Sequence, residues 1–204
     1  MTAAEESMGA EFDDPPGDPL ELLRRWWDAV LEAQAPGATA MSLATVGADG
    51  TPSVRFVAMA DIGADGVCFS TDDRSPKAQE LAQNPHVALA GHWEATGQQY
   101  RIKGVTEPLP DAESERLFAA LPRSAQAALL VAEQSATLDS HEALVHRAAS
   151  LSAEQGPLRR PAHWRSWLVR AQQVQFWAED PLDVHRRLAY IRTTAGWSVR
   201  RLQP

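Results

Sequence analysis

The sequence predicts an antiparallel β-barrel decorated by helices, a mainly β fold built as one domain. Two observations lead to this prediction. Short β-prone runs separated by tight turns lie toward both ends of the chain, at residues 40–71 and 164–202. Between them, stretches with helical periodicity follow one another over residues 108–152. Strands joined by tight turns pair antiparallel, so we expect one barrel with helices packed around it.

The N-terminal elements are marked by turn and cap residues. Asp18 is a suitable N-cap and Pro19 a suitable first helical residue, which predicts a helix over residues 20–33. Glycine-containing turns then separate three strands, in which glycine supplies the positive φ. These strands are expected at residues 40–46, 52–60 and 67–71, followed by a polar corner and a short helix at 77–83.

The remaining elements follow from the same signals. A Thr96-Gly97 turn predicts two antiparallel strands, at residues 86–93 and 98–105. Three helical stretches are expected next, at residues 108–121, 125–133 and 140–152. The C-terminal strands are expected at residues 164–170, 173–177 and 197–202, with His185, Arg186 and Arg187 in a loop before the last.

Composition narrows the function classes. The net charge of −8 argues against non-specific nucleic-acid binding, which needs a basic face. No apolar run approaches the roughly 20 residues that span a bilayer, and the acidic N-terminus does not look like a secretory signal. We therefore expect a cytoplasmic protein with a disordered acidic tail at residues 1–17 and one domain at 18–204.

Metal chemistry is not expected. The six histidines are scattered, and His141 and His146 are five positions apart rather than the four that let two ligands converge on a helix. The P-loop, GxSxG and GxGxxG motifs are absent. Chemistry would therefore have to come from a bound cofactor.

The polar corner before the short helix is the first candidate site. Ser75 and Lys77 lie at the helix start, and Arg55 lies within an earlier strand. Free N–H groups and cations together suit a phosphate monoester. A solvated turn with exposed cations is the alternative that the residues leave open. Trp177, ten residues before Arg187, is placed either to flank a planar ligand or to pack in the core.

Several segments, taken in order, resemble the pyridoxamine 5′-phosphate oxidase family of FMN-binding split barrels. They include TPSVRFV, FSTDDRSPKA, GQQYRI, VQFW and HRRLAY, and the resemblance covers roughly Asp18 to Pro204. Within the family, TGQQYRIKG, AEQGPLRRP and GWSVRRLQP are most similar to the FMN-dependent oxidases of phenazine biosynthesis. The resemblance implies an antiparallel split barrel, an FMN cofactor, and a homodimer with FMN at the subunit interface.

The resemblance also implies a set of FMN-binding residues. Gln134 and Ser135 are expected to come from the other subunit. Carried over position by position, the full set is Arg55, Phe56, Val57, Ala60, Ser70, Thr71, Ser75, Lys77, Gln99, Gln134, Ser135, Trp177 and Arg187. One departure concerns the basic residue that usually precedes Lys77, which is Pro76 here and for which Arg74 could compensate.

The positions that bind the substrate phosphate in the vitamin B6 enzymes have lost their cations and hydroxyls. They are Ala60, Leu117, Leu121, Ala125 and Asp183 here, and only His185 remains. A phosphate dianion bound without partners loses several kcal/mol, whereas an apolar aromatic substrate loses nothing. The resemblance thus favours a substrate without phosphate.

These residues predict an FMN-dependent oxidase that dehydrogenates a reduced phenazine carboxylic acid and passes the electrons to O2, giving hydrogen peroxide. His185 is the expected catalytic and substrate-binding residue, with an ordinary loop histidine as the alternative. Arg123 is the candidate for a substrate carboxylate, with helix capping as its alternative. Pyridoxamine or pyridoxine 5′-phosphate oxidation, and flavin binding without turnover, are the other functions left open.

Overall fold

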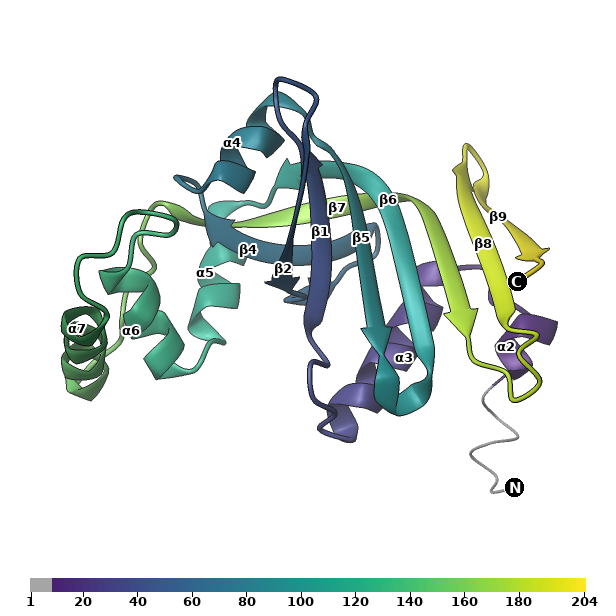
Figure 1. The fold of residues 1–204 in the computed structure, drawn as a ribbon, viewed down its shortest axis with the longest axis horizontal. Coiled ribbons are helices and arrows are strands. Elements are labelled where there is room, and N and C mark those ends of the chain that lie inside the picture. Colours follow the sequence, from purple (N-terminus) through teal and green to yellow (C-terminus); the bar gives the residue numbers. More distant parts are fainter. Residues whose placement is uncertain (1–8) are drawn as a thin grey trace.

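The chain folds around one nine-stranded antiparallel sheet in residues 9–204, the part that this computed structural model describes. The sheet curls into a split barrel, with strands in the order β2-β1-β5-β6-β7-β4-β3 (Figure 1). The strands are β1 (Ala40–Val46), β2 (Pro52–Ala58), β3 (Asp61–Ile62), β4 (Gly66–Asp72), β5 (His86–Trp93), β6 (Gln98–Pro108), β7 (Trp164–Ala178), β8 (Arg186–Thr193) and β9 (Gly196–Leu202).

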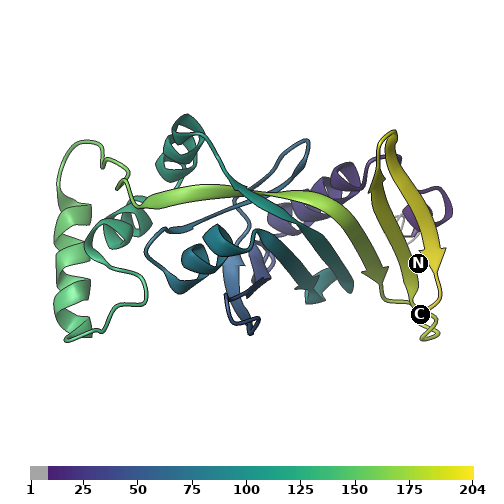
Figure 2. The ribbon, with the colours of Figure 1, turned by 90° about the horizontal axis from the view of Figure 1, so that it is seen from above.

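Strand β7 is the strand that connects the two halves of the sheet. It pairs with β6 along its length, with β4 on its first half, and with β8 on its second half. Figure 2 shows it as a long curved strand between the helices at one end and the β8–β9 hairpin at the other. The sequence predicted two strands here. The structure has one, with Gln172 as a bulge between Ala171 and Gln173, which face Gly104 and Lys103 of β6.

Strand β8 replaces most of a predicted loop. Arg186 and Arg187 are its first residues rather than loop residues. Leu188 and Tyr190 point inward and are fully buried, as the alternation of a half-buried strand requires. The charged beginning of this segment concealed that alternation in the sequence.

Helices cover the edges of the sheet. They are α2 (Ala10–Asp13), α3 (Pro19–Glu32), α4 (Pro76–Gln83), α5 (Asp111–Ala119), α6 (Arg123–Val131) and α7 (His141–Ala153). In Figure 1, α5, α6 and α7 gather beyond the start of β7, whereas α2 lies beneath β8. None of the helices in residues 9–204 is long and apolar enough to cross a membrane.

Helix α3 closes the main core. The predicted cap is confirmed, since the Leu20 N–H donates to the Asp18 carboxylate at 2.9 Å and Pro19 opens the helix. Its buried side carries Leu22, Leu23, Trp26, Trp27 and Val30. The indole of Trp26 meets the Phe176 ring of β7 edge-on, with the ring centres 5.0 Å apart.

The expectation of a disordered tail over residues 1–17 is wrong for residues 9–17, and residues 1–8 lie outside the described part of the chain. Phe12 of α2 is buried, with its ring beside Trp26. The Tyr190 hydroxyl donates to the Pro16 carbonyl at 3.0 Å, and Arg201 donates to the carbonyls of Phe12 and Asp13. The buried Phe12 ring and these backbone hydrogen bonds hold residues 9–17 in place, although the acidic composition of this segment had suggested disorder.

Candidate functional site

The corner between β4 and α4 gathers four of the predicted residues. Thr71 is at the end of β4, Ser75 caps α4, and Lys77 is in its first turn. The Lys77 ammonium donates to the Thr71 hydroxyl and to the Gln134 side-chain carbonyl, both at 3.0 Å. Thr71 also donates to Gln134 at 3.1 Å, and its hydroxyl lies 3.4 Å from that of Ser75. We call Thr71, Ser75, Lys77 and Gln134 the corner cluster.

The corner cluster suits an anion. Lys77 and Ser75 are buried, and burial, together with the nearby charge of Arg55, lowers the pKa of Lys77. A buried ammonium at the Thr71 hydroxyl, with the Ser75 hydroxyl next to Thr71, is a donor set for a phosphate monoester. Gln134 reaches Lys77 within the same chain, which corrects the expectation that it would come from the other subunit.

Arg55 lies next to the corner cluster but is neutralised there. Its guanidinium donates to the Glu80 carboxylate of α4 at 3.0 Å, to the Leu43 carbonyl at 3.3 Å and to the Thr45 hydroxyl. Glu80 was not among the site residues predicted from the sequence. Its position three residues after Lys77 on a short helix was the available signal, because side chains at that spacing share a face.

Arg74 does not stand in for the missing basic residue at position 76. It binds the Asp72 carboxylate with two nitrogen atoms, at 2.6 and 2.9 Å, and lies 3.5 Å from Glu133. Burial of the Asp72 carboxyl raises its pKa, but the hydrogen bonds and charge of Arg74 outweigh this and hold the pKa at about 2. Arg74 thus fixes the corner rather than a ligand.

The Asp72–Arg74 pair gives a pH-dependent stability. Because the folded-state pKa of Asp72 is depressed from 3.8 to about 2, the carboxylate contributes about 2 kcal/mol above pH 4, and this is lost as the pH falls to about 2. Urea unfolding of the native chain and of Asp72→Asn should show a difference in the free energy of unfolding. This difference should be constant from pH 6 to 4 and disappear below that. A difference independent of pH would contradict the pairing, and Asp139→Asn, in an exposed loop, is the control.

A second group of predicted residues lies on the far half of the sheet. Gln99 of β6 is directly opposite Trp177 of β7, and Trp177 is directly opposite Arg187 of β8. Residues in direct register point to the same face, so the three side chains form one row. Their neighbours Tyr100, Phe176 and Leu188 point into the core, which leaves the row on the outer face. We call Gln99, Trp177 and Arg187 the sheet row.

His185 lies beside the sheet row. Its ring centre is 4.6 Å from that of Trp177. Its Nδ1 accepts the backbone N–H of Asp180 at 3.3 Å, so the neutral imidazole carries its proton on Nε2. Nε2 can then donate a hydrogen bond to a molecule that lies against Trp177.

The corner cluster and the sheet row are at opposite ends of β7. Thr71 pairs with Arg165 near the start of the strand, and Gln99 and Arg187 pair with Trp177 near its end. The twelve steps from residue 165 to residue 177 correspond to about 40 Å of extended strand. Figures 1 and 2 both show this strand running from one end of the sheet to the other. A small ligand that touches both groups therefore needs a second copy of the chain.

An apolar cluster lies behind the corner. Leu117, Phe118 and Trp164 are buried together, and Ala60, Leu121 and Leu130 pack against them. Three positions at which the sequence analysis noted a lost phosphate ligand, Ala60, Leu117 and Leu121, are therefore neighbours in space. The nearby Arg116 is paired with Asp61 and Glu113.

Arg123 has the capping role that the sequence left as its alternative. Its three guanidinium nitrogens donate to the carbonyls of Ser152, Glu154 and Gly156, at 2.7, 2.5 and 2.7 Å. These contacts close the turn after α7. The suggestion that Arg123 binds a substrate carboxylate is therefore wrong in this structure.

The other predicted residues are more dispersed. The Phe56 side chain is 79% exposed on the outer face, opposite in direction to its neighbours Arg55 and Val57. The Ser70 hydroxyl is 2.8 Å from that of Ser166 on β7. Ser135, after Gln134, has a left-handed φ of 69° and is exposed. No hydrogen bond links Ser70 or Ser135 to Lys77 within residues 9–204.

Two family models match the chain. The first, described as pyridoxamine 5′-phosphate oxidase, matches residues 28–155. The second, described as the pyridoxine 5′-phosphate oxidase C-terminal dimerisation region, matches residues 164–204. The second model spans β7, β8 and β9 and therefore includes two of the three residues of the sheet row.

Curated relatives and solved structures are similar over nearly the whole chain. The pyridoxine/pyridoxamine 5′-phosphate oxidase of Salinibacter ruber is 38% identical and covers 92% of this chain and 89% of its own. That of Bradyrhizobium sp. is 35% identical and covers 100% and 96%. The structure of PhzG from Burkholderia lata 383, in complex with tetrahydrophenazine-1-carboxylic acid, has a TM-score of 0.87 at 34% identity and covers 95% and 96%.

Proposed function

Because the chain belongs to the pyridoxamine 5′-phosphate oxidase family, we propose that it is an FMN-dependent oxidase acting on a reduced phenazine carboxylic acid. The observation that carries the choice of substrate is the apolar cluster of Ala60, Leu117 and Leu121. A substrate phosphate placed there would lose its hydration without gaining a donor, whereas an apolar tricyclic ring would not. The similarity to the phenazine enzyme of Burkholderia lata supports the same choice.

In this proposal each FMN is shared by two protomers. The corner cluster of one protomer would hold the phosphate, with Lys77 as the charged donor, and the sheet row of the other would hold the ring system. A second protomer packing on the outer face of the sheet is supported by two exposed apolar side chains. Val54 and Phe56, on the edge strand β2, are 72% and 79% exposed. Small residues, Ser42 and Ala90, follow Phe56 in register across β1 and β5.

The protein's own contribution is to place two rings together. When bound, FMN would supply two-electron redox chemistry between the substrate and O2. Because the product gains aromaticity, little acid–base help is required, and positioning dominates. His185 is proposed to contact the substrate through Nε2. Since Nδ1 already accepts a hydrogen bond, a donor role is favoured over that of a proton acceptor.

Pyridoxine or pyridoxamine 5′-phosphate oxidation is the second candidate. The curated relatives that bear this name are 34–38% identical over 92% or more of the chain, which favours a shared reaction. His185 also remains at a position that this branch uses. The loss of donors at the apolar cluster is the observation against it.

An anaerobic spectral titration decides between these candidates. A dihydrophenazine carboxylate should bleach the flavin absorption of the purified dimer, and air should restore it, whereas pyridoxamine 5′-phosphate should have no effect. Bleaching by pyridoxamine 5′-phosphate alone would assign the protein to the second candidate. Bound flavin that neither compound reduces would leave flavin binding without turnover, and the proposed oxidase would be rejected.

A further inference from the structure

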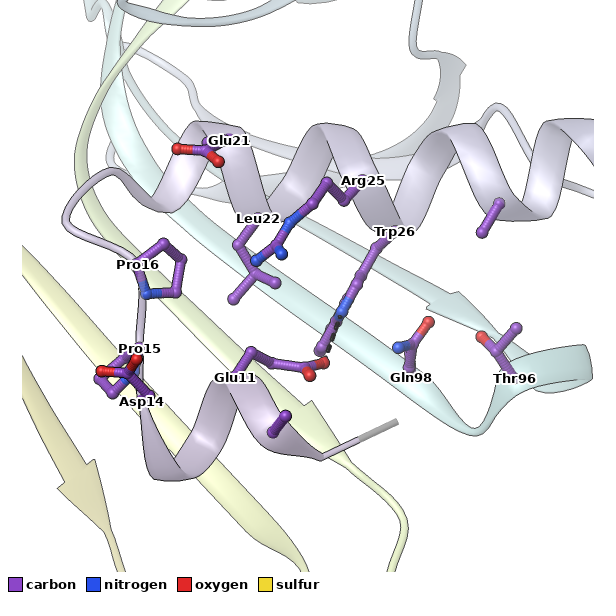
Figure 3. A pocket seen from close by; sticks show the side chains of 12 residues that line it. Glu11, Asp14, Pro15, Pro16, Glu21, Leu22, Arg25, Trp26, Thr96 and Gln98 are labelled. Carbon is purple, nitrogen blue, oxygen red and sulfur yellow. Dashed lines mark hydrogen bonds between the residues drawn. The ribbon is translucent and has the colours of Figure 1, made fainter. Parts of the chain in front are cut away.

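A cavity of about 550 Å³ lies away from both groups of the proposed flavin site. It lies between α2, residues 21–29 of α3 and the turn between β5 and β6, and is partly open to solvent (Figure 3). Gln98 lines it and is adjacent to Gln99 on β6. Because alternate residues of a strand point to opposite faces, the cavity and the sheet row are on opposite sides of the sheet. Its volume is within the range of small-molecule sites.

One wall of the cavity is apolar and fixed in place. It is formed by Leu22 and Trp26 of α3 together with Pro15 and Pro16. The indole N–H of Trp26 donates to the Glu11 carboxylate at 2.9 Å, which holds both side chains at the rim seen in Figure 3. Because Trp26 is 5% and Leu22 1% exposed, the apolar surface open to a ligand is that of the half-buried Pro15 and Pro16, with only a small part of the indole.

Gln98 provides a polar group without a partner. The residue is 6% exposed, and its carboxamide, which makes no hydrogen bond within residues 9–204, keeps access to solvent in the cavity. Figure 3 shows the side chain among those that line the cavity. Buried amides are nearly always hydrogen-bonded, so this amide is available to a molecule in the cavity.

Charges of both signs line the cavity, on side chains that are at least partly exposed. Glu21 and Arg25 are four residues apart on α3, with the acid first, which is the spacing that favours a helical ion pair. Nevertheless, Arg25 has no carboxylate within 4.0 Å among the described residues, and neither Glu21 nor Asp14 has a cation. The guanidinium of Arg25 and the three carboxylates of Glu11, Asp14 and Glu21 thus border one space.

We propose that this cavity binds a small zwitterion, a free amino acid with an apolar or aromatic side chain. Arg25 would pair with its carboxylate, the carboxylates of Glu11 and Glu21 would accept from its ammonium, and Gln98 would hydrogen-bond to one of these groups. The side chain would lie against Pro15, Pro16 and the accessible part of Trp26. A pure anion would meet three carboxylates, and a pure amine would leave Arg25 unpaired.

Calorimetric titration of the flavin-loaded protein with three matched probes tests the proposal. L-phenylalanine carries both charges, phenethylamine lacks the carboxylate, and 3-phenylpropanoate lacks the ammonium. We expect phenylalanine to bind about tenfold or more tightly than either of the others. Arg25→Gln should weaken phenylalanine about tenfold and leave phenethylamine unchanged, whereas Arg24→Gln, one position outside the cavity, should change neither.

Three results would overturn the proposal. They are no binding of any probe at millimolar concentration, equal affinity for phenylalanine and phenethylamine, and equal losses in Arg24→Gln and Arg25→Gln. Gln98→Leu supplies a second variant, which should weaken phenylalanine without changing the thermal midpoint. Flavin content and oxidase activity are measured on the same samples, so failure of the cavity proposal is distinct from failure of the proposed function.

Discussion

Replacing Lys77 with methionine is expected to release flavin from the protein and leave the fold intact. Lys77 is the buried cation of the corner cluster, and its ammonium is held by Thr71 and Gln134. Loss of a charged hydrogen bond to phosphate removes about 1.5–3 kcal/mol of binding, a decrease in FMN affinity of ~10- to ~100-fold. Methionine keeps the apolar stem and removes a charge whose pKa burial already lowers.

The fluorescence quenching of FMN by the apoprotein measures this affinity. Arg116→Met is the matched control, because this exposed cation of α5 pairs with Asp61 and Glu113 and should bind FMN like the native chain. The thermal midpoint of flavin-free Lys77→Met should not fall below that of the native apoprotein. Unchanged FMN affinity in Lys77→Met would remove the corner cluster from the flavin site.

Gly66→Ala is expected to destabilise the fold by about 3 kcal/mol or more. A Cβ atom on Gly66 would lie 1.8 Å from the Val169 carbonyl oxygen and 3.1 Å from the Ala171 nitrogen, both on β7. Backbone atoms in a paired strand cannot move aside as a flexible side chain can, so β4 and β7 must separate. Because β4 carries Thr71 and leads to Lys77, flavin affinity should fall with stability.

Urea unfolding of flavin-free protein measures the effect without ligand linkage. Gly17→Ala is the control, since no atom lies within 4 Å of a Cβ built there, and its stability should change by about 0.5 kcal/mol or less. A loss below about 1 kcal/mol in Gly66→Ala would show that β4 and β7 do not pack as described.

The strands and helices with local signals could be predicted from the sequence. Asp18 and Pro19 set the start of α3, and Gly50 and Gly97 mark two strand-to-strand turns where their φ values of 81° and 58° require glycine. The continuity of β7 could not be predicted, because a bulge at Gln172 has the same local appearance as a break. The order of Phe12 depends on β8 and β9, which are far away in the sequence.

The candidate site was predictable where residues lie close in the chain. Thr71, Ser75 and Lys77 are within seven positions of each other and do form one cluster. The partners that cationic side chains find on distant elements could not be predicted, although the helical spacing from Lys77 indicated the face on which Glu80 lies. Glu80 neutralises Arg55 across the barrel, and Arg123 is held by carbonyls about thirty residues later. In both cases tertiary contacts decide which donors of a cationic side chain stay available.

In the proposed dimer, each flavin site combines the corner cluster of one protomer with the sheet row of the other. Two inactive variants test it, Lys77→Met and Trp177→Ala, each carrying a different affinity tag. In their heterodimer one site has both defects and the other has none. We predict that neither homodimer retains FMN and that the doubly purified heterodimer binds one FMN per two chains. A heterodimer that binds none would show that both groups serve the same site from one chain, which would contradict the account.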